Sequence, residues 1–258
     1  MMCSIMKKGN AYIKPLFKKR FLSLLLHFDI AVVLFVIMNL ALGVKMNLKN
    51  TLLAFTTWTS IGNSNWYITA VLGMYLIIIL AFSVFRKHKL PALITVSVLT
   101  VVFAIVLLKV GKPEWYYNTL LLFPVGMWYA YLKKHIDKFV MKNNLTYMFF
   151  MVAAVGLFTV CYRIKGFGLP FYWIYACAFM MIIILITMKV KIGNPILSML
   201  GRHVFGIYIL QRIPMPIFQR LGLNGNNMLY FFLCFAVTLL MSAVFDMLMK
   251  KLDKKLFA

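Results

Sequence analysis

Long apolar stretches recur along the whole chain and leave few charged residues between them. A helix needs about 20 mostly apolar residues to cross the hydrocarbon core of a bilayer, because unpaired backbone groups cost several kcal/mol there. Eight stretches meet this requirement, at residues 21–44, 66–85, 90–108, 115–132, 145–162, 169–188, 203–220 and 228–249. Charged residues make up only 13% of the chain, against about 25% in soluble proteins. We predict an all-α polytopic integral membrane bundle of about eight transmembrane helices.

Positively charged residues fall unevenly on the two sides that these spans define. Twenty of the 28 Lys and Arg residues lie on the side of the two chain ends, seven lie in the opposite loops, and one lies within a span. Cytoplasmic loops retain Lys and Arg, so the asymmetry predicts that both ends are cytoplasmic. We expect a basic cytoplasmic segment at residues 1–20, one helical membrane domain at 21–250 and a cytoplasmic tail at 251–258.

Composition and motifs exclude several classes of function. The net charge of +23 does not predict a nucleic-acid partner, because the basic residues lie between apolar runs and not on one water-exposed face. The four cysteines show no CxxC spacing and have no His at metal-ligand spacing, so we expect neither a disulfide nor a metal site. The sequence has no GxSxG, Walker, Rossmann or HExxH motif, and therefore no soluble-enzyme signature.

Ionisable side chains inside the spans are few, and they are costly unless they are paired or functional. Arg212 lies at mid-depth in the seventh span beside Gln211, and two prolines interrupt the span directly afterwards. Arg212 either holds an anionic or carbonyl group of a substrate or forms a structural ion pair with Asp29 or Glu114. Carbonyl groups freed by proline are tolerated only inside protein or beside a wet cavity, so we predict a polar internal site here.

Other polar residues lie in the first span and at the start of the second. His27 and Asp29 are two residues apart and point to different helix faces, so they cannot form a dyad, and Asp29 is expected to contact another helix. Asn65 and Trp66 begin the second span. An Asn at this position caps a helix and a Trp anchors it in the headgroup zone, and both are also candidates for substrate contact.

Four segments between residues 12 and about 218 follow one another in a recognisable order. They are a basic segment leading into a helix, a Trp-led span, a Phe-Pro-x-Gly-Met helix, and a Leu-Gly pair before a small-aromatic-Ile-Tyr helix. The segments read "YIKPLFKKRFLSLLLHF", "NSNWYITAVLGMYLIIIL", "LLFPVGMWYAYLKKHI" and "LSMLGRHVFGIYILQRIPMPIF". Together they resemble the acyltransferase 3 family of bacterial membrane acyltransferases.

The resemblance implies transfer of an acyl group, often acetyl, from cytoplasmic acyl-CoA to a hydroxyl of a cell-envelope glycan or lipid-linked glycan. It implies a multi-pass protein of the bacterial cytoplasmic membrane, in contact with membrane lipid and using acetyl-CoA as a co-substrate and not as a bound cofactor. The residues expected to meet the CoA phosphates are Lys18, Lys19 and Arg20. Those expected to contact the acceptor are Arg212, Gln211, Tyr208, Asn65, Trp66 and Glu114.

The sequence also departs from the family pattern. Family members have about ten spans, and the first carries an Arg or Lys and the His regarded as the catalytic base. The chain begins at what resembles the segment after the second span, so we expect the usual catalytic His to be absent, and His27 does not match its position. Catalytic residues are therefore unassigned. The alternatives are a truncated and inactive family member or a non-enzymatic transporter or polysaccharide-export component.

Overall fold

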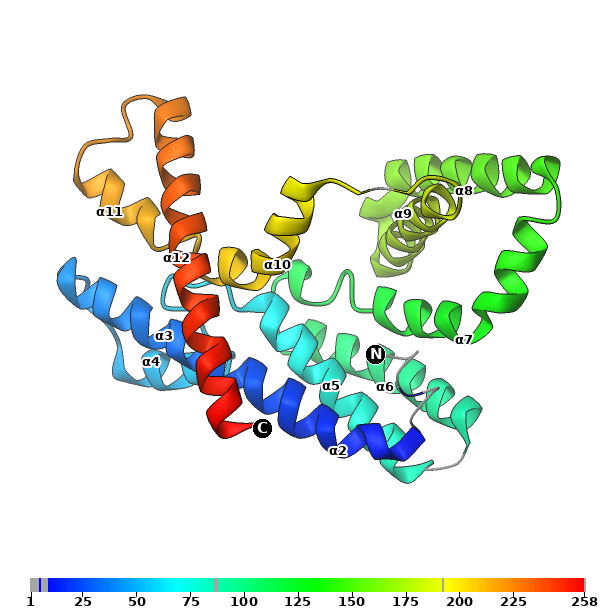
Figure 1. Cartoon of the computed structure of the whole chain (residues 1–258), viewed down its shortest axis with the longest axis horizontal. Helices are drawn as coiled ribbons and strands as arrows, with labels where there is room; N and C mark the ends of the chain where they lie inside the picture. Colours follow the sequence, from blue (N-terminus) through cyan, green and yellow to red (C-terminus); the bar gives the residue numbers. More distant parts are fainter. Residues whose placement is uncertain (1–4, 6–8, 86–87, 192, 258) are drawn as a thin grey trace. The chain divides into compact units, whose positions relative to one another are not determined.

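The computed structural model describes residues 5, 9–85, 88–191 and 193–257, and every regular element within these ranges is a helix (Figure 1). This confirms the predicted all-α fold. The α-helices are α2 (Ile13–Leu16), α3 (Ser23–Ala41), α4 (Leu48–Phe55), α5 (Trp66–Val84), α6 (Lys89–Lys109), α7 (Leu122–Val140), α8 (Asn144–Ile164), α9 (Leu169–Lys189), α10 (Pro195–Leu210), α11 (Pro214–Arg220) and α12 (Asn227–Leu256). The 3-10 helices are η1 (Gly9–Tyr12), η3 (Glu114–Tyr116) and η4 (Lys165–Phe167), and η2 (Phe17–Leu22) is a π-helical segment that continues into α3.

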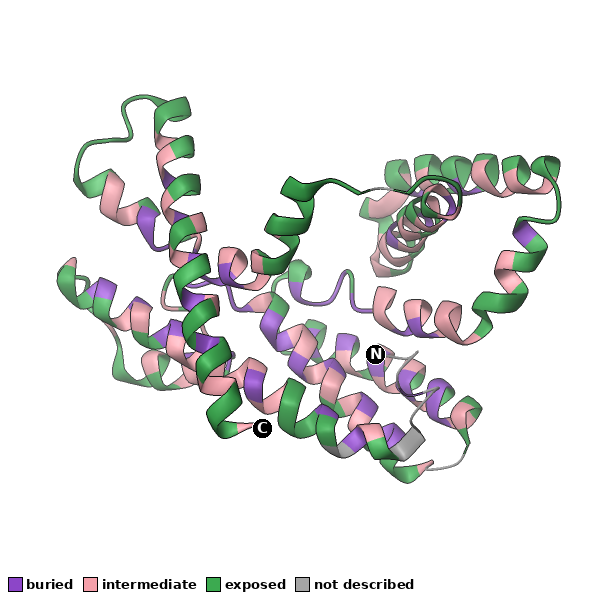
Figure 2. Ribbon diagram, viewed as in Figure 1, coloured by how far each residue is buried: buried purple, intermediate pink, exposed green. Residues whose placement is uncertain are grey.

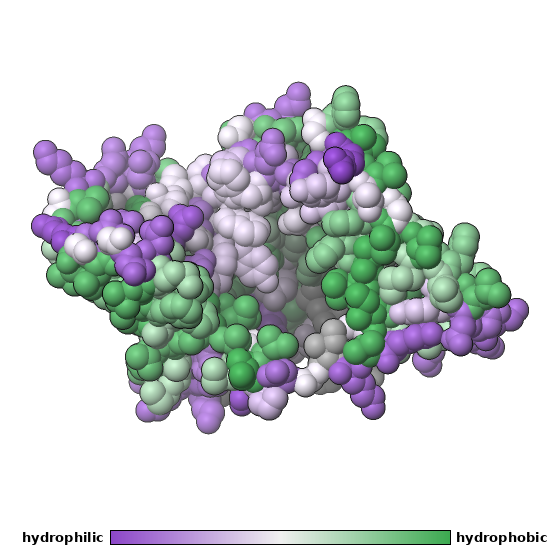
Figure 3. Space-filling view, turned by 90° about the horizontal axis from the view of Figure 1, so that it is seen from above, coloured by the Kyte–Doolittle hydropathy of each residue, from purple (hydrophilic) through white to green (hydrophobic). Residues whose placement is uncertain are grey.

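Six helices in the described part of the chain are long and apolar enough to cross a bilayer. They are Phe17–Ala41, Trp66–Val84, Lys89–Lys109, Asn144–Phe167, Leu169–Lys189 and Asn227–Leu256. Each coincides with one of the predicted spans. Figure 3 shows broad hydrophobic areas on the surface, with hydrophilic side chains gathered in separate patches. The chain is an integral membrane protein, because such surfaces require a lipid environment.

The fourth and seventh predicted spans take other forms. Residues 115–132 do not form one helix, because the short helix η3 and a series of turns precede α7, which starts at Leu122 and runs through a Lys-rich sequence to Val140. Lysine favours helix nearly as well as leucine, so α7 continues where the apolar run ends. The stretch 203–220 is divided between α10 and α11, and its break at residues 211–213 confirms the predicted interruption before the prolines.

Asparagine side chains begin four of the helices. Asn47 caps α4, Asn143 caps α8, Asn194 caps α10 and Asn226 caps α12, each accepting a hydrogen bond from a backbone N–H of the first turn. The distance from Asn143 Oδ1 to the Thr146 nitrogen is 2.7 Å. An Asn at this position satisfies a donor that the helix itself leaves unpaired. The asparagines therefore indicate the starts of these helices.

Contacts divide the chain into two compact units. Unit 1 comprises residues 1–17 and 73–192, and unit 2 comprises residues 18–72 and 193–258. The predicted membrane domain at 21–250 thus covers parts of both units. In unit 1, α8 packs along α9 after a turn at Gly168, whose φ of +146° is open to glycine, and α7 contacts both helices. Buried positions are sparse on α8 and α9 (Figure 2).

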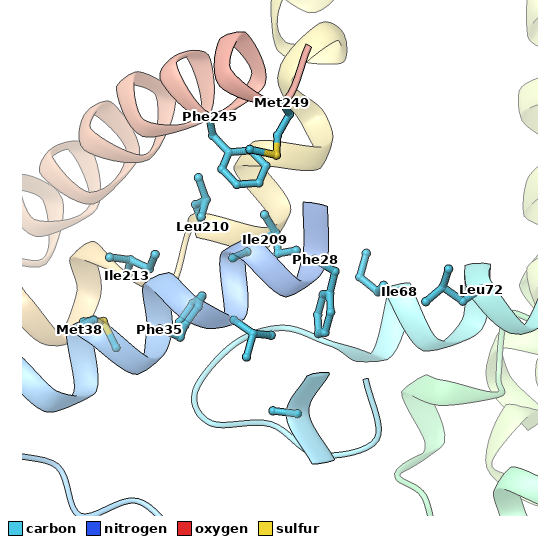
Figure 4. Close-up of a cluster of buried hydrophobic side chains, with 13 residues drawn as sticks. Phe28, Phe35, Met38, Ile68, Leu72, Ile209, Leu210, Ile213, Phe245 and Met249 are labelled. Atoms are coloured by element: carbon cyan, nitrogen blue, oxygen red, sulfur yellow. The ribbon is translucent and has the colours of Figure 1, made fainter. Parts of the chain in front are cut away.

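Unit 2 contains a contiguous apolar core formed by α3, the start of α5, α10 and α12. In Figure 4, Phe245 and Met249 of α12 lie above Ile209 and Leu210 of α10. On the other side of α10, Phe28 of α3 lies beside the first turn of α5. Lipid tails are as apolar as these side chains, so dispersion contacts and close packing hold this core together more than exclusion of water.

Candidate functional site

Two of the five acidic residues of the chain lie on one face of α12. Asp246 and Asp253 are seven residues apart, which is about two helical turns, so their side chains point the same way. Asp253 pairs with His27 of α3, and Asp246 pairs with His203 of α10. Each pair joins α12 to a different helix of unit 2. Both acid–histidine pairs therefore lie where α12 meets its neighbours.

Asp253, His27 and Ser23 form one hydrogen-bonded cluster. His27 Nε2 lies 2.9 Å from Asp253 Oδ1, and Ser23 Oγ donates to both carboxylate oxygens at 3.0 and 3.1 Å. Ser23 and His27 share a helix face because they are four residues apart, and Ser23 Oγ lies 3.4 Å from the same Nε2 atom. The cluster is only partly buried, so a ligand can approach it.

The arrangement differs from a nucleophilic Ser-His-Asp triad. In such a triad the serine and the carboxylate occupy opposite ring nitrogens, whereas Ser23 and Asp253 both contact Nε2 of His27. A carboxylate only accepts hydrogen bonds, so Nε2 carries the proton in a neutral ring and Nδ1 keeps its lone pair. His27 is thus arranged as a proton acceptor at Nδ1, and Ser23 as a group that holds Asp253 in place.

The second pair lies at a close helix crossing. His203 Nδ1 is 2.6 Å from Asp246 Oδ2, and Gly206 faces the same part of α12. A Cβ atom at Gly206 would lie 2.9 Å from Ser242 Cβ and 3.2 Å from Ser242 Cα. Only glycine permits this approach, as is common where membrane helices pack closely. We assign this pair to helix packing.

Cationic side chains surround the first cluster. Lys18, Lys19 and Arg20 are exposed on the π-helical segment η2, about two turns before His27. Asp253 is flanked on α12 by four exposed lysines, at positions 250, 251, 254 and 255. Because the Ser23 and His27 contacts fix this end of α12 against α3, both groups of cations lie at the same end of unit 2. π-Helical segments are rare and frequently mark functional sites.

A polar loop between α4 and α5 folds back against α3. Asn39 Nδ2 donates to the Ile61 carbonyl at 2.8 Å, and a Cβ atom at Gly62 would lie 3.9 Å from the Phe35 ring. Thr57 has a positive φ of 62°, a strained conformation for a β-branched residue. Hydrogen bonds within the loop pair the carbonyl groups of Thr57, Thr59 and Asn63.

Asn65 holds this loop together. Its amide donates to the Thr57 and Thr59 carbonyls at 2.7 and 2.9 Å, and the Thr57 carbonyl also accepts from Thr69 Oγ1 at 3.0 Å. Asn65 is 4% exposed, so its amide is enclosed within the loop. Its role in the structure is to position the next residue, Trp66.

Three aromatic rings meet where this loop enters α5. Trp66 and Tyr208 have ring centroids 6.1 Å apart and Tyr67 and Tyr208 5.3 Å apart, all in edge-to-face geometry. Tyr208 Oη accepts a hydrogen bond from the Tyr67 backbone at 3.3 Å. Tyr208 therefore connects α10 to the start of α5. Phe205, one turn earlier on α10, has its ring centroid 6.1 Å from that of His27.

The remaining predicted residues lie beyond the end of α10 or in unit 1. Gln211 is half-buried and Arg212 exposed in the break after α10. No ion pair in the described part of unit 2 includes Arg212, and Asp29 Oδ1 is buried without a hydrogen-bond partner among the described residues. Of the two ion pairs considered for Arg212, with Asp29 or with Glu114, the one with Asp29 is therefore absent among these residues. Glu114 belongs to unit 1, where it begins η3 and accepts from Asn118 Nδ2 at 3.5 Å.

Sequence reasoning did not select Ser23, Asp253, His203 or Asp246. The available signals were the scarcity of acids, the seven-residue spacing on α12 and the four-residue spacing of Ser23 and His27. The partners are more than 200 residues apart for the first cluster, and no local pattern predicts such a contact. Within the described residues, no group of three or more His, Cys, Asp or Glu side chains is placed to hold a metal ion.

Comparison with known proteins places the chain in a family. The acyltransferase 3 family model, described as an acyltransferase domain, matches residues 2–247. The match includes the basic segment, the polar loop, the aromatic rings and the break after α10, and it ends before Asp253. No curated protein and no solved structure matches the chain. With almost the entire chain covered by this model, the chain belongs to the acyltransferase 3 family of membrane acyltransferases.

Proposed function

We propose that the protein transfers an acyl group, acetyl in the simplest case, from cytoplasmic acyl-CoA to a hydroxyl of a cell-envelope polysaccharide at the bacterial cytoplasmic membrane. One observation carries the proposal. Two ring contacts follow one another along α10, Phe205 with His27 near the cationic end of unit 2 and Tyr208 with Trp66 beside the polar loop. A donor and an acceptor that entered from these two directions would meet beside His27.

The cationic end suits the donor. CoA carries several phosphate charges, and Lys18, Lys19 and Arg20 together with the α12 lysines supply an excess of positive charge next to a single carboxylate. Lysine binds phosphate as a point charge and arginine in a two-pronged geometry. The phosphates would hold the donor at the exposed end while its acyl-bearing arm extends along α3 toward His27.

The aromatic rings suit the acceptor. Sugars present apolar ring faces and polar edges, and Trp66 and Tyr208 offer both an apolar face and a polar tip. Gln211 and Arg212 follow Tyr208 within one turn and can donate hydrogen bonds to sugar oxygens. Trp66 is held in place by the loop that Asn65 closes. We assign Asn65 to positioning, and Trp66, Tyr208, Gln211 and Arg212 to acceptor contact.

His27 supplies the proton transfer in this proposal. The acceptor hydroxyl attacks the thioester carbonyl, the C–O bond forms, and the hydroxyl proton passes to His27 Nδ1. The C–S bond then breaks, and the proton passes from His27 to the CoA sulfur, so the products are the ester and free CoA. Asp253 stabilises the protonated ring and fixes its orientation, a contribution typical of general acid–base catalysis.

A second function, polysaccharide export, is favoured by one observation. The turns before α7 are a second interruption of a predicted span, in addition to the break after α10, and transporters often contain broken helices in both halves. The family match favours acyl transfer. The two functions can be distinguished, because acyl transfer changes the O-acetyl content of the polysaccharide and export changes its amount.

The test measures both the amount and the O-acetyl content of envelope polysaccharide in a deletion strain. We expect acetylation to be lost while the amount is unchanged, and to be restored by the wild-type gene. Arg212→Ala should restore it poorly, with the acceptor KM raised about tenfold or more, since a hydrogen bond to a charged group contributes about 1.5–3 kcal/mol. Arg163→Ala, an exposed residue of unit 1, should restore it fully.

A reduced amount of polysaccharide with normal acetyl content per sugar would support export and contradict the transfer proposal. Unchanged amount and unchanged acetylation would contradict both. Arg212→Ala and Arg163→Ala must be compared at equal protein level in the membrane, so that a folding defect is separated from a loss of acceptor binding.

A further inference from the structure

Unit 1 contains a cavity that the proposed chemistry does not use. It has a volume of about 390 Å³ and lies among α7, α8 and α9. Its lining includes Trp128, Phe139, Phe150, Ile184 and Met188 and is apolar throughout. A cavity of this kind does not hold ordered water, because water needs several polar partners. Its natural contents in a bilayer are hydrocarbon.

The polar atoms of the lining residues are turned toward partners outside the cavity. Trp128 Nε1 donates to Ser97 Oγ at 3.0 Å, and Tyr129 Oη donates to Asp137 Oδ1 at 2.9 Å. Only the carbon faces of these rings remain for the cavity. The two hydrogen bonds also fix the ring positions, so the cavity is a built feature of this helix group.

The lining helices carry a dense group of cations at one end. Lys134 and Lys138 of α7 lie two residues from lining residues and therefore on a different face of that helix. Lys142 is exposed in the turn before α8, two residues after the lining residue Val140. Lys189 follows the lining residue Met188 directly, donates to Asn144 Oδ1 at 3.0 Å and lies 4.1 Å from the centroid of the Tyr147 ring. The only acid on α7 is Asp137, which Lys133 already neutralises at 2.6 Å.

We propose that this cavity binds one acyl chain of an anionic phospholipid, with the lipid phosphate held by Lys142 and Lys189, which follow the last lining residues of α7 and α9. Charge complementarity selects this occupant. An apolar cavity alone accepts any hydrocarbon, but basic groups beside membrane helices on the Lys-rich side attract anionic headgroups. The Lys-rich side is the predicted cytoplasmic side, where the lipid would be drawn from the inner leaflet.

The low burial of α8 and α9 supports access from the bilayer. In the most apolar stretch of each helix, only 11% of the residues of α8 and 17% of those of α9 are buried, against 33% for Phe17–Ala41. A lipid chain can therefore reach the cavity laterally, between helices that present most of their surface to the membrane. The site is separate from the His27 cluster, so it can be tested without the enzymatic reaction.

The first test measures lipid bound to the purified full-length chain after detergent delipidation, using native mass spectrometry. Dioleoylphosphatidylglycerol is the anionic probe and dioleoylphosphatidylcholine is the zwitterionic control. We expect the anionic lipid to bind at least about tenfold more tightly. The double variant Lys142→Gln/Lys189→Gln should bind both lipids about equally. Equal binding of the two lipids by the wild-type chain would overturn the proposal.

Matched substitutions at the other end of the same helix pair give the control. Arg163→Gln combined with Lys165→Gln removes two charges from the opposite end of α8 and should leave the preference for phosphatidylglycerol within about twofold of wild type. An equal loss of preference in this variant would mean that overall charge, and not this site, attracts the lipid. That result would also overturn the proposal.

The second test locates the acyl chain and does not involve the lysines. Phosphatidylglycerol brominated on its acyl chain quenches nearby tryptophan fluorescence, and Trp128 lines the cavity. We expect the quenched fraction in wild type to fall in Trp128→Phe, and to stay unchanged in Trp58→Phe, a tryptophan of unit 2. Equal quenching of wild type and Trp128→Phe would show that no chain occupies the cavity.

Discussion

The two units differ in where they keep their polar groups. In unit 2, histidines, acids and aromatic rings face one another across helices, and they hold α3, α10 and α12 together through side-chain contacts. In unit 1, helices α7, α8 and α9 leave an apolar cavity, and the Trp128 and Tyr129 side chains that line it direct their polar atoms to partners outside it. Polar groups inside a membrane protein are costly and tend to mark function. The two proposals accordingly place proton transfer in unit 2 and lipid binding in unit 1.

The largest effect that tests this division of roles between the two units is expected on catalysis. Asp253→Asn and Asp137→Asn make the same chemical change, one in each unit, at carboxylates that accept at least one short hydrogen bond. Asp253→Asn should lower acyl transfer about 100-fold or more, because His27 loses the carboxylate that stabilises its protonated form. Asp137→Asn should leave the rate within about twofold. CoA release by the purified chain in liposomes measures both.

Equal losses in the two Asp variants would contradict the division of roles, provided that both proteins reach the membrane in equal amounts. A shift in the pH–rate profile of Asp253→Asn, relative to wild type, would separate a role in proton transfer from a merely structural one. A uniform decrease at all pH values would indicate that Asp253 acts only through packing.

The parts of this structure that depend on neighbouring residues in the sequence could be predicted. The contacts between residues far apart in the sequence could not. The helix ends were visible because Asn caps and apolar runs are local patterns, and the break after Gln211 was visible because proline removes a backbone donor. Asp253 was hidden in a lysine-rich stretch that was predicted to be a cytoplasmic tail. The structure continues α12 through that stretch to Leu256 and packs it against α3.

The predicted bounds of the fourth span, 115–132, were wrong for a related reason, since α7 both begins and ends later. Hydropathy detects apolar runs, whereas a helix continues through any residues that favour it, as α7 does through Lys133 and Lys134. The predicted start at residue 115 falls in the short helix η3, where Tyr116 is buried, and turns follow from the buried Tyr117 onward. Asn65 illustrates the same limit for function, since its residue type suits substrate contact but its amide is engaged by two carbonyl groups of its own loop.

The next effect in size concerns packing. Gly206 in unit 2 and Gly73 in unit 1 both face another helix closely, yet they face different atoms. A Cβ atom at Gly206 meets the Ser242 backbone at 3.2 Å, while one at Gly73 meets the far end of the Phe103 ring at 2.6 Å. Gly206→Ala should cost about 1–3 kcal/mol because backbone cannot move aside, and Gly73→Ala less, because a ring can rotate away.

Denaturation of the two glycine variants in mixed micelles measures this difference in the free energy of unfolding. A larger loss for Gly73→Ala than for Gly206→Ala would mean that α10 and α12 separate easily. The His203 and Asp246 pair would then not be held by a close crossing, and its assignment to packing would have to be withdrawn.

A smaller effect is expected at the aromatic residues. Trp66→Leu should raise the acceptor KM about 3- to 10-fold, because it removes a ring contact worth about 0.5–1.5 kcal/mol beyond its area. Trp173→Leu in unit 1 removes the hydrogen bond from Nε1 to the Tyr117 carbonyl at 3.3 Å and should lower stability by about 1 kcal/mol without changing KM. Kinetics with varied acceptor at saturating acetyl-CoA separate the two, and a KM change for Trp173→Leu would extend the acceptor site to unit 1.

The smallest effect is expected at the surface ion pair of unit 1. The hydrogen bond from Lys133 to Asp137 raises the pKa of Lys133 above the ordinary lysine value. A raised lysine pKa stabilises the fold at every pH below the ordinary value of 10.5 and ceases to do so as the pH rises through the folded value. Exposed pairs contribute only about 0–1 kcal/mol, so Lys133→Gln should lower stability by less than about 0.5 kcal/mol at pH 7. The difference from wild type should shrink above pH 10.5 and in high salt, because salt screens exposed charges. A loss of several kcal/mol would mean that this pair is enclosed by lipid and not by water, and unit 1 would then resemble unit 2 in relying on a desolvated charge pair.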